Sequence, residues 1–163
     1  MILEARAANC FSTLHVLKLN GVAWGKFEGR WFSEALDIQL TGRRRLRLEN
    51  VRWLWTQFVL SDTRGGETLG QAQRAGLLTT RWDLDLRTGP AQLVRAGWFA
   101  TGYVVLRGEE TLAEVNRLGL CERGWEVRGQ DDLEDTDLLL AGLVYHIIRR
   151  RESQQSAAHA GGT

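Results

Sequence analysis

Residues 138–148 read Leu-Leu-Leu-Ala-Gly-Leu-Val-Tyr-His-Ile-Ile, and His146 is the one residue of this run able to carry a charge. Acidic residues crowd the segment 131–137 before it, and three arginines follow at 149–151. Both flanks suit the dipole of a helix. A helix that is apolar on all sides is buried in protein or in a membrane, and about 20 residues are needed to span a bilayer. The run therefore predicts a short helix, over about residues 133–151, enclosed by the rest of the chain.

The preceding 130 residues predict short strands joined by tight turns. The chain has 18 glycines and one proline, and alternating apolar segments recur between turn signals such as Asn20-Gly21. In the clearest of them Trp82, Leu84 and Leu86 alternate with charged residues, so these three are expected to point inward. About twelve strands closed into a barrel leave a wide lumen, because barrel diameter grows with strand number. We therefore expect a mainly β fold, a closed antiparallel barrel of about twelve strands around a buried C-terminal hydrophobic α-helix. The seven tryptophans are expected to help fill it: 24, 31, 53, 55, 82, 98 and 125.

One hairpin predicts its own register. A two-residue loop after Leu40 would set Ile38 opposite an arginine. A three-residue loop over 41–43 instead pairs Leu36 with Leu48 and Ile38 with Leu46, so the apolar sets match, as a half-buried hairpin requires. The polar face then pairs Asp37 with Arg47 and Gln39 with Arg45.

Length and composition predict one domain over residues 1–152 and a small, polar, disordered tail over 153–163. The net charge of +1 argues against nucleic-acid binding. Arginine accounts for all but two of the 21 basic residues, a bias typical of bacteria with GC-rich genomes.

Cys10 and Cys121 have no metal-ligand spacing and are expected to be free thiols. The N-terminus does not read as a signal peptide, so a cytoplasmic protein is expected.

The strand count, restart phrases such as Gly65-Gly66-Glu67-Thr68-Leu69-Gly70, and the terminal helix 138–148 together resemble the tubby-like superfamily. This superfamily includes the LURP-one-related proteins and the phospholipid scramblases. The resemblance covers residues 10–151 and is nearest to the small single-domain bacterial members. It implies a twelve-stranded barrel around a buried helix. Some relatives bind phosphoinositides or are linked to lipid movement, although none of their functional residues maps onto a position here.

The usual catalytic and metal-binding patterns are weak. His15, His146 and His159 lack companions at ligand spacing, so no zinc site and no cofactor is expected. For His146 a buried neutral imidazole is favoured over a pH sensor. The acidic segment 131–137 lacks the glycine and glutamate of a calcium loop, which favours a helix cap. Asp83 and Asp85 are flanked by arginines and read as a surface charge ladder. The chain is therefore expected not to be an enzyme, and no small-molecule substrate is evident.

The best functional candidate is the basic hairpin. Arg43, Arg45 and Arg47 are expected to project from one face, about 6.5–7 Å apart by strand geometry, and arginine forks suit phosphate oxygens. The leading hypothesis is a binding or scaffold domain that contacts anionic phospholipid headgroups. The alternative is a protein–protein interaction module. Residues 149–151 form the second basic candidate.

Overall fold

A computed structural model describes residues 1–9, 12–29, 33–52, 56–76, 79–97, 101–119 and 123–160. The described residues form twelve strands, one short 3-10 turn (η1, Thr41–Arg43) and one helix (α1, Asp135–Ala160). The strands are β1 Ile2–Ala7, β2 Leu14–Leu19, β3 Val22–Gly29, β4 Leu36–Leu40, β5 Arg45–Arg52, β6 Gln57–Asp62, β7 Thr68–Arg74, β8 Trp82–Leu86, β9 Gly89–Arg95, β10 Tyr103–Arg107, β11 Glu110–Arg117 and β12 Gly124–Gly129.

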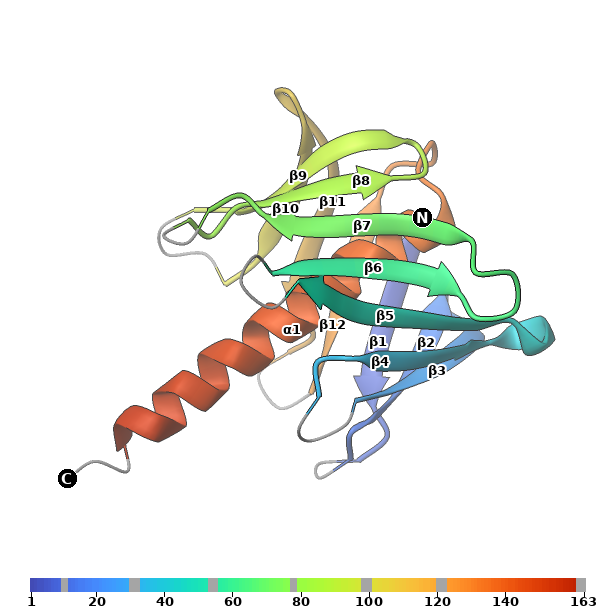
Figure 1. Cartoon of the computed structure of the whole chain (residues 1–163), viewed down its shortest axis with the longest axis horizontal. Helices are drawn as coiled ribbons and strands as arrows, with labels where there is room; N and C mark the ends of the chain where they lie inside the picture. The colour runs from blue at the N-terminus through green and yellow to red at the C-terminus, as the bar shows by residue number, and fades with distance from the viewer. Residues whose placement is uncertain are drawn as a thin grey trace.

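The strands close into a single antiparallel barrel in which each pairs with its neighbours in the chain, and β1 joins β2 to β12 (Figure 1). This confirms the predicted fold class. The closing strand β1 was not predicted, because Ile2–Ala7 mixes alanine with charged residues and carries no turn signal. Its burial alternates as in a strand with one face inward: Leu3 and Ala5 are fully buried, and the residues between and beside them are exposed or partly buried.

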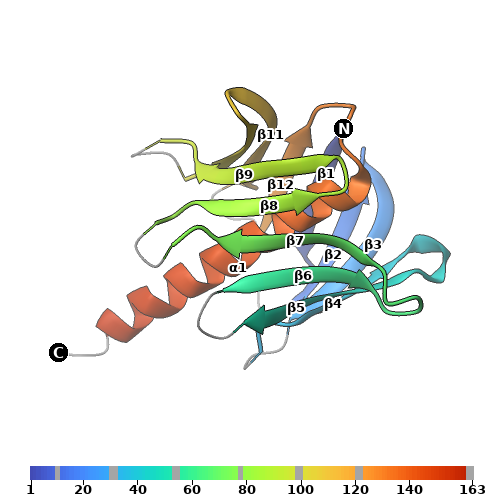
Figure 2. The same cartoon turned by 45° about the horizontal axis from the view of Figure 1, so that its top comes forward.

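The helix α1 passes through the barrel, and strands surround its first half (Figures 1 and 2). Every residue from Thr136 to Tyr145 is buried, so no side of this segment faces solvent. The predicted core positions Leu140, Leu143, Val144 and Ile147 are all at most 2% exposed. The apolar run therefore completes the core that a barrel of this width needs, as the sequence predicts.

The hairpin of β4 and β5 has the predicted register. Leu36 pairs with Leu48 and Ile38 with Leu46, and all four side chains are buried. The loop consists of the three residues of η1, and the amide of Leu40 donates to the carbonyl of Arg44 at 2.8 Å. Matching of the apolar faces was sufficient to choose this loop length.

Other local predictions are confirmed where the structure describes them. Asn20 and Gly21 both have positive φ, at 49° and 80°, as their two-residue hairpin requires. In β8 the residues Trp82, Leu84 and Leu86 point inward. Trp125 is also buried and Trp24 partly so, whereas the remaining four tryptophans lie outside the described residues: Trp31, Trp53, Trp55 and Trp98.

Asp137 fixes the start of α1 against the barrel wall. Its carboxylate accepts hydrogen bonds from the Glu134 amide at 3.2 Å, the Arg87 amide at 2.8 Å and the Thr88 hydroxyl at 2.9 Å. A carboxylate in the first turn satisfies amides that the helix leaves unpaired and suits the helix dipole. Among the described residues no group of three potential ligands could hold a metal ion. The structure thus gives Asp137 of the acidic segment a capping role.

The end of α1 differs from the prediction. The helix was expected to end near residue 151, before a disordered tail over 153–163, but it continues to Ala160. Beyond Arg151 it is exposed through residues 153–159. Arg149 and Glu152 form an ion pair at 2.8 Å, and Ser156 donates to the carbonyl of Glu152 at 3.0 Å. Because the buried segment already provides the helical nucleus, each further residue extends the helix at little cost.

The packing of α1 predicts an unusual response at Gly142. Alanine favours a helix by about 1 kcal/mol over glycine, but a Cβ at residue 142 would overlap the six-membered ring of Trp125. We expect Gly142→Ala to lower the free energy of unfolding by about 1–3 kcal/mol in urea denaturation. Gly65→Ala is the matched control, because nothing lies near that position. A Gly142→Ala protein as stable as the parent would contradict this packing.

Candidate functional site

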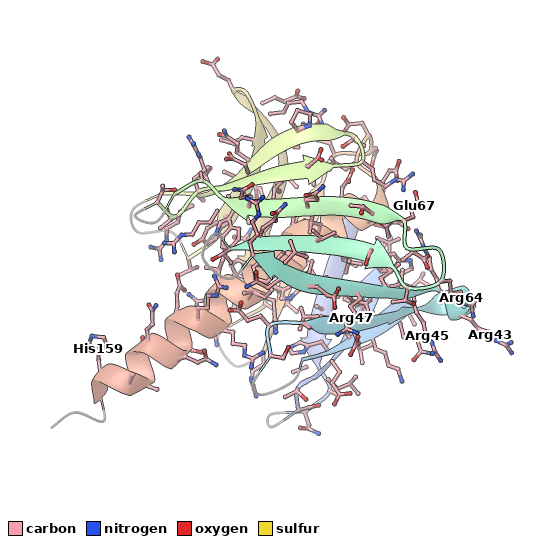
Figure 3. All side chains as sticks on the ribbon, viewed as in Figure 1. Arg43, Arg45, Arg47, Arg64, Glu67 and His159 are labelled. Carbon is pink, nitrogen blue, oxygen red and sulfur yellow. The ribbon has the colours of Figure 1, made fainter. Side chains whose placement is uncertain are left out.

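The basic hairpin lies at the end of the molecule opposite the tip of α1, as Figure 3 shows for Arg43 and His159. Arg45 and Arg47 lie on β5, but Arg43 belongs to the turn η1 and has a left-handed backbone, with φ of 64°. The expected three-residue ladder on one strand face is therefore wrong at Arg43, because the turn that sets the register takes this residue out of the strand.

Carboxylates lie close to the two arginines that are on the strand, Arg45 and Arg47. Arg47 Nε lies 2.8 Å from Glu49 Oε1 and 3.8 Å from Asp37 Oδ1. Arg45 borders an open depression of about 580 Å³ that Glu28 and Asp37 also line. Nearby carboxylates offset the positive potential that an anion would meet. Anion binding at Arg43, Arg45 and Arg47 stays a prediction, because both positive and negative side chains lie at this hairpin.

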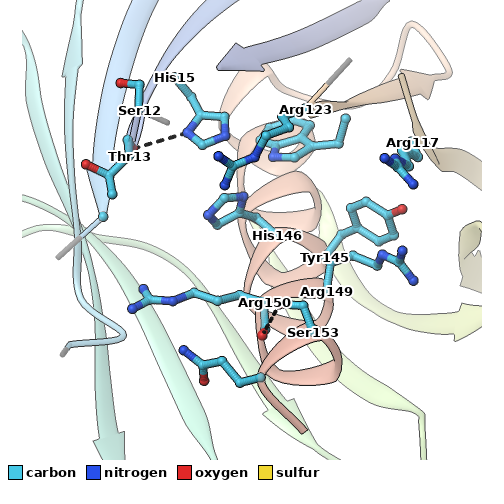
Figure 4. Close-up of a pocket in the computed structure, with 14 residues that line it drawn as sticks. Ser12, Thr13, His15, Arg117, Arg123, Tyr145, His146, Arg149, Arg150 and Ser153 are labelled. Carbon is cyan, nitrogen blue, oxygen red and sulfur yellow. Dashed lines mark hydrogen bonds between the residues drawn. The ribbon is translucent and has the colours of Figure 1, made fainter. Parts of the chain in front are cut away.

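A second basic site lies where α1 leaves the barrel. We call it the helix-exit cleft: a half-open cavity of about 490 Å³ between α1 and the strands β2, β3, β11 and β12 (Figure 4). Its polar and charged lining residues are Ser12, Thr13, His15, Arg117, Arg123, Tyr145, His146, Arg149, Arg150, Ser153 and Gln154. None of the described residues that line it is acidic.

Three separate parts of the chain supply the arginines of the cleft. Arg117 ends β11, Arg123 precedes β12, and Arg149 and Arg150 lie on the helix just beyond its enclosed segment. The guanidinium of Arg149 is 2.8 Å from Glu152, and Arg150 donates to the carbonyl of Ser33 at 3.1 Å. The cleft is therefore strongly basic, and its helical arginines are held in place by neighbours.

Two histidines meet at the floor of the cleft. The His15 ring stacks on Phe27 at 4.7 Å and meets the His146 ring edge-on at 4.8 Å. His15 Nδ1 lies 3.2 Å from the Thr13 carbonyl oxygen. Because that oxygen only accepts, Nδ1 carries the proton. The Nε2 atom of the neutral ring is then an acceptor.

Both imidazoles are held neutral by their surroundings. Burial lowers the pKa of His15, and Arg123 lowers it further against the opposing effect of the Thr13 hydrogen bond. Burial lowers the pKa of His146 to about 3, with further contributions from His15, Arg150 and Arg123. The neutral imidazole predicted for His146 is consistent with this environment.

An indole group also borders the cleft. Trp125 is 1% exposed, and its Nε1 atom is buried without a hydrogen-bond partner among the described residues. A buried donor without a partner is costly, and such groups commonly mark a place where a ligand or water binds. The cleft is therefore bordered by positive charge and by an indole whose buried N–H has no acceptor among the described residues.

Arg151 closes the barrel beside the cleft. It donates two hydrogen bonds of 2.6 Å to Glu34, and its guanidinium lies over the rings of Phe58 and Trp82, 5.5 and 6.0 Å from their centroids. Burial alone would raise the pKa of Glu34, but hydrogen bonds and positive charge from Arg151, aided by Asn50 and Arg150, hold it below its ordinary value. The guanidinium of Arg151 is thus held by contacts within the barrel, whereas Arg149 and Arg150 line the cleft.

The remaining sequence candidates do not gather at a site. Asp83 and Asp85 project from the exposed face of β8, and Asp83 lies 3.8 Å from Arg81. His159 is exposed near the end of α1. Cys10 and Cys121 lie outside the described residues. In the described part of the chain, no helix combines the length and apolar character needed to cross a membrane.

The sequence reasoning missed the contributions of Arg117, Arg123 and Tyr145, although it named the arginines at 149–151 as a second basic segment. The available signal was positional: Arg117 and Arg123 flank the connection before the last strand, at the barrel end where the helix must leave. Finding it requires knowing which strand ends share one end of the barrel.

No family model, curated protein or solved structure matches this chain. The resemblance to the tubby-like superfamily stays a prediction.

His146 gives the protein a testable sensitivity to acid. Its pKa is 6.5 ordinarily and about 3 when folded, so the unfolded chain takes up the proton first. Its contribution to stability is complete above pH 6.5 and is lost as the pH falls toward 3, by up to about 1.4 kcal/mol per pH unit. We expect His146→Phe to flatten the fall in unfolding free energy below pH 6.5, measured by urea denaturation across pH. His159→Phe is the exposed control and should leave the slope unchanged; equal slopes in all three proteins would contradict the assignment.

Proposed function

We propose that this chain is a non-enzymatic binding domain that holds a phosphate-bearing anion, such as a phospholipid headgroup, in the helix-exit cleft. The observation that carries the proposal is the lining of the cleft: four arginines and no described acidic residue around a cavity of about 490 Å³. This volume lies within the range of about 300–1,000 Å³ usual for small-ligand sites.

The chemistry of the lining suits a phosphate monoester. Guanidinium groups present paired donors that match phosphate oxygens, and they remain charged at all physiological pH values. Arg117, Arg123 and Arg149 come from different elements, so an anion between them is approached from several directions. The buried indole N–H of Trp125, a residue that also lines the cleft, has no acceptor among the described residues.

Geometry favours this cleft over the basic hairpin. At the hairpin, Arg47 already contacts Glu49 and Asp37, and Arg45 shares its depression with two carboxylates. At the cleft Glu152 is paired with Arg149, and none of the described lining residues is acidic.

The test is calorimetric titration with glycerol 3-phosphate, with glycerol as the uncharged control. We expect binding of the phosphate and none of glycerol, and we expect the affinity to fall as salt rises. Replacement of Arg117, Arg123 and Arg149 by glutamine should reduce the affinity at least tenfold, because each lost charged hydrogen bond costs about 1.5–3 kcal/mol.

The matched control is the glutamine triple variant of Arg43, Arg45 and Arg47, which removes the same charge at the opposite end of the barrel. It should bind like the parent. Loss of binding in this variant alone would place the site at the hairpin, and an absence of phosphate binding by the parent would refute the proposal. Thermal melts of both variants check that the fold is retained.

A further inference from the structure

Two side chains in the lining of the helix-exit cleft can gain a positive charge, because both are imidazoles. His15 lies on β2 and His146 on α1, and the centroids of their rings are 4.8 Å apart. Figure 4 shows both rings next to Arg123, in the same cavity as the other arginines. A phosphate that binds among those arginines therefore lies close enough to act on the charge of the imidazoles.

The charged groups that face the two rings from the described residues are arginines. Arg123, which precedes β12, acts on both imidazoles, and Arg150 of α1 acts on His146. Tyr145 of α1 is also titratable, but burial raises the pKa of its hydroxyl and keeps it neutral. β3 contributes the uncharged ring of Phe27, and the described part of the lining contains no carboxylate. Burial and positive neighbours both disfavour an imidazolium, so the pair is neutral in the protein alone.

A bound phosphate reverses this balance. Its negative charge offsets the effect of the arginines on the rings and favours the charged form of a nearby imidazole. A protonated ring nitrogen also becomes a charged hydrogen-bond donor to a phosphate oxygen. Because linkage is reciprocal, an anion that favours protonation of the cleft is itself bound more tightly once the cleft is protonated.

Of the two rings, His15 is the better place for the proton. Its Nδ1 atom already donates to the Thr13 carbonyl oxygen at 3.2 Å, and this bond persists in the charged ring. The new proton joins Nε2, which is an acceptor in the neutral ring. The bond to Thr13 acts to raise the pKa of His15, against burial and Arg123, whereas burial and three positive or titratable neighbours lower the pKa of His146 to about 3.

We propose that the helix-exit cleft takes up a proton on His15 when it binds its phosphate anion, so that the cleft holds the anion more tightly in mild acid than in mild alkali. This inference rests on the proposed function, because it concerns the same anion in the same cleft. It adds regulation to that function: the four arginines attract the anion at every physiological pH, and His15 makes the strength of binding depend on pH.

The experiment is calorimetric titration of the full chain with glycerol 3-phosphate at about pH 8 and about pH 6, on either side of the ordinary range of histidine. At each pH two buffers with different ionisation enthalpies are used, because the difference in heat gives the number of protons taken up. The ligand itself titrates near pH 6, at roughly the second pKa of a phosphate monoester, and this contribution is common to all variants. The comparison between parent and variant therefore isolates the histidine.

His15→Gln replaces the imidazole by a side chain that cannot be charged, and His159→Gln is the matched control, because His159 is exposed near the end of α1. We expect the ratio of the parent's affinity to that of His15→Gln to be about tenfold larger at the lower pH, as one charged hydrogen bond predicts. The His15→Gln protein should also take up fewer protons on binding. The His159→Gln protein should match the parent in both measurements.

A second measurement needs no variant at His15, whose ring stacks on Phe27 and contributes to packing. Nuclear magnetic resonance of the imidazole nitrogens in the parent should show that glycerol 3-phosphate raises the pKa of His15. An unchanged pKa, or a rise at His146 in place of His15, would overturn the inference. Phosphate binding with the same pH dependence and proton uptake in the parent and His15→Gln would also overturn it, while the proposed function stands. An absence of binding at both pH values would refute both proposals.

Discussion

An apolar helix that must be covered on every side is the constraint on which this structure depends. Eleven consecutive residues, 138–148, contain two titratable groups, Tyr145 and His146, and burial lowers the pKa of His146 and raises that of Tyr145, so both are held neutral. A single sheet or a second helix would cover one face only, whereas a closed barrel covers all of them. The fit is close enough that glycines are needed on both sides of the contact: Gly142 of α1 meets Trp125, and Gly70 of β7 meets Leu140.

The same constraint creates the candidate functional site. A helix that fills a barrel has to leave it, and its composition changes at that point from apolar to basic, at residues 149–151. Arg151 seals the opening through Glu34, Phe58 and Trp82. The neighbouring arginines then meet Arg117 and Arg123 across the opening. A concentration of positive charge beside a cavity is therefore a geometric consequence of where the helix ends its buried segment.

Features that depend on local pattern could be predicted from the sequence, and features that depend on assembly could not. The register of β4 and β5 follows from matching Leu36 and Ile38 to Leu48 and Leu46, and it was predicted residue by residue. The barrel followed from strand count and from the need to enclose 138–148. The cleft was missed because its arginines are distant in the chain and meet only when β11, β12 and α1 are assembled. The extension of α1 to Ala160 was missed because short polar residues favour a helix only weakly, and they are helical here because a stable helix precedes them.

The order of the elements along the chain has a consequence for folding. All strands precede the helix that fills them, and every strand pairing joins chain neighbours except that of β1 with β12. Hairpins can therefore form early at small entropic cost, but the inward faces of the strands have no partner until residues 138–148 are available. A nascent chain that lacks this segment exposes the apolar lining of a barrel. Closure of β1 on β12 is thus coupled to docking of the helix, so an element made after all twelve described strands commits the barrel to its fold.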